Sequence, residues 1–161
     1  MRQCERGAIA VTVVLLLPVF LVVLGLVADA GYLFIARRGV QVAADMGALA
    51  GVQALDLDLL ATGEIHLIDS AAKQTALAYA QENLTVQLAD ITETNQASIS
   101  VHVYNPGEGT VRHQQTGRLL VDPTVAVSIS VPIRLHFTGW IWPEVTISAR
   151  ADASVMEREG F

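Results

Sequence analysis

The first fifth of the chain carries a long apolar run, with no charged residue between Arg6 and Asp29. A helix rises about 1.5 Å per residue, so residues 8–28 cover about 30 Å, the thickness of a bilayer's hydrocarbon core. The apolar region of a cleaved signal peptide is shorter, about 7–15 residues. The pattern therefore predicts a transmembrane helix over residues 8–28, following a short cytoplasmic segment of residues 1–7, with a cleaved signal peptide as the alternative.

The helical pattern continues beyond Asp29 through residues 29–55, where it becomes more polar. One side of this extension carries small residues three or four positions apart: Ala36, Ala43, Gly47, Ala50, Gly51 and Ala54. We call them the small-residue strip. Such a strip lets a second helix approach closely, and that helix belongs either to this chain's own domain or to another subunit. Pro18 lies inside the apolar run and predicts a kink or local unwinding there.

The remaining residues, 56–161, predict one small α+β domain. Residues 55–66 read as an exposed connection, and apolar residues at helical spacing predict a helix from Asp69 or Ser70 to about Glu82, ending at Asn83. Apolar and polar residues then alternate over 98–103, 125–131 and 145–153, which is typical of antiparallel strands with one buried face. A further strand is expected over 84–91. The predicted architecture is a long helix, a shorter helix and a small antiparallel meander, with the helices covering one face of the sheet.

An aromatic cluster lies in the connection between the last two predicted strands. It consists of Phe137, Trp140 and Trp142, directly before Pro143. Because aromatic rings bury large areas, we expect them to cap the end of the sheet core. The alternatives are a contact with a partner subunit or with the membrane interface.

Composition narrows the function. The 161 residues carry a net charge of −6, and no concentrated basic patch is present, so nucleic acid is not an expected partner. The single cysteine, Cys4, precedes the apolar run and is expected to be a free thiol. No hydrolase, phosphate-binding or zinc-protease motif occurs, so we expect neither an enzyme nor a cofactor. The spacing of the four histidines matches no zinc site: His66, His102, His113 and His136.

Three stretches carry a resemblance to a known family. Residues 6–11 (RGAIAV), residues 29–38 (DAGYLFIARR) and above all residues 40–51 (VQVAADMGALAG) resemble the N-terminus of the TadE/TadG-like family of tight-adherence, or Flp-type, pilus assembly. Looser likenesses follow at residues 76–83 and over the last strands. The resemblance implies a pilin-like membrane protein: an accessory or minor component of a bacterial or archaeal pilus assembly and secretion system, with pilins and platform proteins as partners.

Processing and orientation are separate expectations. A prepilin peptidase would cut between Gly7 and Ala8, and glutamate would then be expected at the fifth mature position, where this chain has Thr12. We therefore expect the N-terminus to be retained. Two arginines flank the span on each side, and the additional α-amine favours an N-terminus in the cytoplasm and a domain outside the inner membrane. The alternative function is a membrane-tethered cell-envelope binding or sensing module that does not assemble into a pilus.

Overall fold

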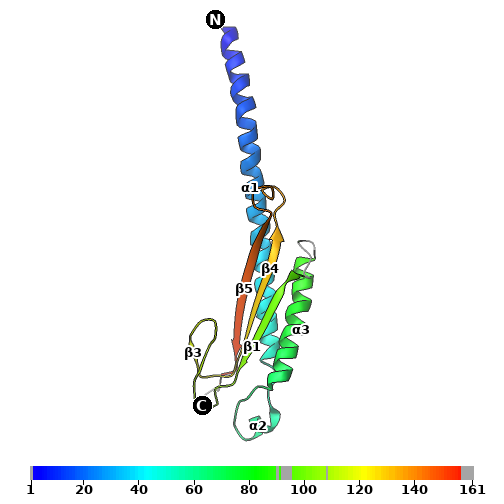
Figure 1. The fold of residues 1–161 in the computed structure, drawn as a ribbon, viewed down its shortest axis with the longest axis vertical. Coiled ribbons are helices and arrows are strands. Elements are labelled where there is room, and N and C mark those ends of the chain that lie inside the picture. Colours follow the sequence, from blue (N-terminus) through cyan, green and yellow to red (C-terminus); the bar gives the residue numbers. More distant parts are fainter. Residues whose placement is uncertain (1, 90, 92–95, 108, 157–161) are drawn as a thin grey trace.

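The computed structural model describes residues 2–89, 91, 96–107 and 109–156, and of residues 2–9 only the backbone. Figure 1 shows one helix, α1, extending far beyond a domain in which a sheet and a second long helix lie along its C-terminal half. The chain order is helix, helices, then strands, so the α+β architecture predicted from the sequence is confirmed.

Helix α1 spans Arg2–Gly51. From Ala10 to Leu24 every side chain is exposed, and only 6% of its most apolar 18-residue window is buried inside the molecule. A core helix of a soluble domain would be mostly buried, so this half of α1 needs another apolar medium. Among the described residues α1 is long and apolar enough to cross a membrane, by length and composition.

Helix α1 continues through Pro18 without unwinding, and a kink there stays a prediction. A proline removes one helical hydrogen bond and crowds the preceding turn, but the bonds of the neighbouring turns remain.

The sheet has three antiparallel strands in the order β1–β4–β5. They are β1 (Ser98–Tyr104), β4 (Thr124–Arg134) and β5 (Glu144–Ser154). In the register Val127 lies opposite both Val101 and Ala151. The alternation predicted for these strands is confirmed: the odd-numbered residues of β4 from Val125 to Ile133 are fully buried, and both long helices cover this face.

The second long helix, α3 (Asp69–Leu88), is longer than predicted. Neither the stop at Asn83 nor the strand over 84–91 is correct. Leu84 and Leu88 continue the buried four-residue series of Ala72, Ala76 and Ala80, so burial of this face extends the helix. The Asn83 side chain donates to the Tyr79 carbonyl oxygen, 2.8 Å away, and thus stays within the helix instead of ending it.

Two small elements were missed by the sequence prediction. The connection after α1 contains a short helix, α2 (Leu57–Ala61), whose N-terminus is capped by the Asp56 carboxylate. Between β1 and β4 the chain forms a hairpin of β2 (Val111–Arg112) and β3 (Leu119–Leu120). Leu120 and Val111 of this hairpin pack with Tyr104 of β1 and Ala126 of β4 and so bury part of the sheet's other face.

Candidate functional site

The small-residue strip packs against α3 of the same chain. A methyl group placed on Gly47 would lie 2.8 Å from Ala80 Cβ and 2.9 Å from the Ala76 carbonyl oxygen, and one on Gly51 would lie 2.8 Å from Ala76 Cβ. These distances are shorter than ordinary contacts, so only glycine permits this approach. All members of the strip are buried except Ala54, which is half-buried. In this structure the strip therefore packs on the chain's own domain, which is the first of the two partners considered for it, the second being another subunit.

A second junction joins α1 to the sheet at the end of the apolar run. The Asp29 carboxylate is buried and accepts hydrogen bonds from the backbone N–H groups of His136, Phe137 and Thr138 and from the Thr138 hydroxyl. The two bonds to Thr138 are the shortest, at 2.6 and 2.7 Å. All of these donors belong to the loop of residues 135–143 between β4 and β5, which we call the β4–β5 loop. The sequence analysis treated Asp29 only as the end of the apolar run and missed its role as a hydrogen-bond acceptor. The signal in the sequence was a carboxylate placed directly at the boundary of that run.

The loop also contacts α1 on either side of Asp29. A methyl group on Gly25 would lie 3.0 Å from Phe137 Cβ and 3.4 Å from Phe137 Cγ, so the Phe137 side chain contacts the helix inside the apolar run. One turn after Asp29, the ring of Tyr32 meets the ring of His136 edge-on at 4.9 Å, and the Tyr32 hydroxyl donates to the Ile91 carbonyl oxygen. The β4–β5 loop is therefore held at the axial level of Gly25 to Tyr32.

The aromatic cluster does not cap the sheet core, so that prediction is wrong. Phe137, Trp140 and Trp142 are 62%, 80% and 60% exposed. The reason lies in the Asp29 bonds: they turn the loop backbone and Thr138 toward α1, which leaves Trp140 and Trp142 exposed and places Phe137 beside Gly25, away from the sheet core. Ile133, fully buried, fills the end of the core instead.

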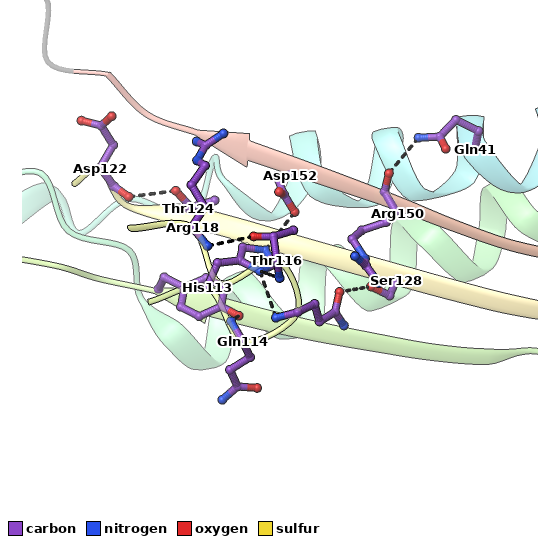
Figure 2. A network of polar contacts seen from close by, with 12 residues as sticks. Gln41, His113, Gln114, Thr116, Arg118, Asp122, Thr124, Ser128, Arg150 and Asp152 are labelled. Carbon is purple, nitrogen blue, oxygen red and sulfur yellow. Dashed lines mark hydrogen bonds and ion pairs between the residues drawn. The ribbon is translucent and has the colours of Figure 1, made fainter. Parts of the chain in front are cut away.

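A polar network lies at the opposite end of the domain (Figure 2). His113 Nδ1 accepts from the backbone N–H groups of Gln115 and Thr116, both at 3.2 Å, so the ring proton is on Nε2, which donates to Asp152 at 3.2 Å. Tyr104 packs on the His113 ring at 5.1 Å. The bonds to Nδ1 thus shape the turn between β2 and β3, and the bond from Nε2 holds this hairpin on β5.

This network has no catalytic arrangement in the part of the chain that is described. Ser128 donates to the Gln115 side chain at 2.7 Å rather than to His113. Gln41 reaches from α1 to the Arg150 carbonyl oxygen on β5 at 3.0 Å (Figure 2). No three His, Cys, Asp or Glu residues among those described lie together as a metal site. The network fastens the hairpin, the sheet and α1 to one another.

Gly7 and Ala8 flank the position where a prepilin peptidase would cut. Their backbone lies in α1, and their side chains are outside the described part. Whether a peptidase cuts between them stays a prediction.

Comparison with known families gives one match. Residues 7–54 match the family described as putative Flp pilus-assembly TadE/G-like. No curated protein and no solved structure matches the chain significantly. The matched residues coincide with α1, from the start of its apolar half through the small-residue strip to the turn that follows. This match confirms the resemblance found in the sequence: residues 7–54 are similar to the TadE/G-like Flp pilus-assembly family.

Proposed function

We propose that the chain is a membrane-anchored, pilin-like accessory or minor component of a tight-adherence pilus assembly system, with no enzymatic activity of its own. The main observation behind the proposal is that the residues of the family match are those of α1, a helix whose two halves have different surroundings. One half is apolar and free of the domain, and the other is the spine on which α3 and the sheet are packed. A subunit built in this way presents a membrane helix and a folded domain as one rigid rod.

We further propose that the N-terminus lies in the cytoplasm, that the domain lies outside the inner membrane and that the anchor is retained. Two arginines flank the span on each side, and the α-amine adds a positive charge on the N-terminal side, which supports a cytoplasmic N-terminus. The absence of glutamate at the position of Thr12 supports retention of the N-terminus.

The surface proposed for subunit contacts is an exposed face of α1 outside the span, which carries Arg38 and Asp45 as well as large apolar residues. Phe34 and Ile35 are 71% and 61% exposed, and Leu49, four turns further on, is 53% exposed. At 100° per residue Leu49 falls between the other two around the helix axis, so the three share one face. This face points away from α3, whereas the small-residue strip is already occupied.

Site-specific photocrosslinking in cells that make the pilus system tests the proposal. A photoreactive residue at Phe34 or Leu49 of the full chain is expected to crosslink to pilins or platform proteins. The matched control is Glu82, which is exposed on α3 away from that face. Equal crosslinking at all three positions, or none at Phe34 and Leu49 together with normal piliation after deletion of the protein, would overturn the proposal and favour a tethered binding or sensing module.

A further inference from the structure

The β4–β5 loop is a nine-residue segment without a formal charge, LHFTGWIWP, between Arg134 and Glu144. It exposes a compact set of large apolar side chains: Phe137, Trp140, Ile141 and Trp142. Monomeric soluble domains rarely concentrate such residues at one loop tip without a partner for them. Apart from the contact of Phe137 with Gly25, these side chains remain largely exposed, although the loop itself is firmly anchored through Thr138.

The position of the loop along α1 indicates what covers it. Asp29 is the first charged residue after the apolar run, and Gly25, which contacts Phe137, lies four residues earlier inside that run. Four residues correspond to about 6 Å along a helix axis. If α1 spans a bilayer, Phe137 therefore lies at the depth where the acyl chains meet the headgroups. In Figure 1 the loop connecting β4 and β5 is at the end of the domain that faces the free half of α1.

The chemistry of the loop fits that depth. Tryptophan is enriched at membrane–water interfaces because an apolar ring carries one polar N–H. An apolar medium also requires backbone groups to be satisfied within the protein. Asp29 accepts from three loop N–H groups, and Thr138 O accepts from those of Ile141 and Trp142 at 2.9 and 3.0 Å. Exposed arginines at positions 37 and 38 follow slightly more than two turns beyond Asp29, on the side where lipid phosphates would lie.

We propose that the β4–β5 loop is a second membrane anchor, which inserts Phe137, Trp140 and Trp142 into the interface of the outer leaflet of the bilayer that α1 crosses. The Asp29 bonds fix the insertion depth of the loop relative to α1. Together the two anchors hold the sheet and α3 upright, with the β2–β3 hairpin at the end distant from the lipid. This inference rests on the membrane-spanning role of α1 and is independent of any role in pilus assembly.

The chain provides its own probe, because its two tryptophans both lie in this loop. The full chain is reconstituted into phosphatidylcholine vesicles whose acyl chains carry bromine either near the headgroup or near the chain end. Tryptophan emission is expected to be quenched strongly by the shallow bromines and weakly by the deep ones. Trp140→Phe and Trp142→Phe assign the signal to each ring while retaining an apolar side chain.

A matched control moves the probe to the distant end. Leu119 in β3 is 59% exposed, comparable to Trp142. The variant Trp140→Phe/Trp142→Phe/Leu119→Trp should show no quenching by either lipid. Absence of bromine quenching in the unmodified chain would overturn the proposal, whether the rings face water or another copy of the chain. Equal quenching of the Leu119→Trp variant would overturn it as well, because the domain would then lie flat on the lipid.

Discussion

Replacement of Gly47 by alanine tests whether the close approach of α1 and α3 is what holds this domain together. The added methyl group would meet Ala80 Cβ at 2.8 Å and the Ala76 carbonyl oxygen at 2.9 Å. Neither neighbour has a flexible side chain that can move aside, so one helix has to shift. Overpacking of this kind costs about 1–3 kcal/mol.

Helix propensity acts in the opposite direction and has to be separated from the steric cost. Alanine is favoured over glycine in a helix by about 0.8–1.0 kcal/mol. Gly31 supplies the control, because it lies on the same helix, is exposed and would have nothing within 4 Å of an added methyl group. Gly31→Ala is therefore expected to stabilise the protein by up to about 1 kcal/mol. The difference between the two variants isolates the steric cost, about 1–3 kcal/mol in favour of Gly31→Ala.

Thermal unfolding of the full chain in a mild detergent, followed by circular dichroism, measures this difference. For a domain of this size about 1 kcal/mol corresponds to a shift of about 4 °C or more in Tm. We expect Gly47→Ala to melt below Gly31→Ala by at least that amount, and Gly47→Leu, with three more carbon atoms, to melt lower still. If Gly47→Ala were as stable as Gly31→Ala, the α1–α3 approach would be looser than the structure indicates, and the reasoning would fail.

Three further predictions concern other parts of the molecule. Asp29→Ala should accelerate amide hydrogen exchange of the β4–β5 loop more than Thr138→Val does. The Asp29 variant loses the acceptor of several loop N–H groups, whereas the Thr138 variant loses one donor. Equal exchange in the two variants would count against the Asp29 junction. Asn105→Ala should lower the free energy of unfolding by about 1–3 kcal/mol in urea titrations. The Asn105 side chain accepts a hydrogen bond from the Leu67 N–H at 2.9 Å and donates one to the Leu67 carbonyl oxygen at 3.0 Å, and both are lost in the variant. An unchanged midpoint would contradict this prediction. Intact-mass measurement of the protein from its native membrane should find residues 1–7 still attached; peptidase-dependent loss of the segment ending at Gly7 would refute retention of the N-terminus.

Helices and strands could be predicted from the sequence where neighbouring residues alone determine them. A charge-free run about 30 Å long predicts a membrane helix whatever else the chain does. Strict alternation over 125–131 and 145–153 identified the strands and their buried face, since a period of two residues assigns each side chain to one side of a sheet. The prediction failed at 84–91, where Leu84 and Leu88 are compatible with either period and contact with α1 and the sheet decides for a helix.

Several features were decided only by the tertiary structure. The sequence identified the small-residue strip as a surface for close helix packing, but the partner was ambiguous because α3 and a neighbouring subunit would make the same demand on Gly47 and Gly51. In the same way, the sequence placed the aromatic cluster between two strands and could not orient it. The orientation depends on hydrogen bonds between Asp29 and Thr138, which are 109 residues apart, and such long-range pairing leaves no periodic trace in a single sequence. The sequence thus determined that the chain has a helix long and apolar enough to cross a membrane, a small-residue strip and an aromatic loop. The fold determined that the strip faces inward while the aromatic side chains remain largely exposed beside the apolar run.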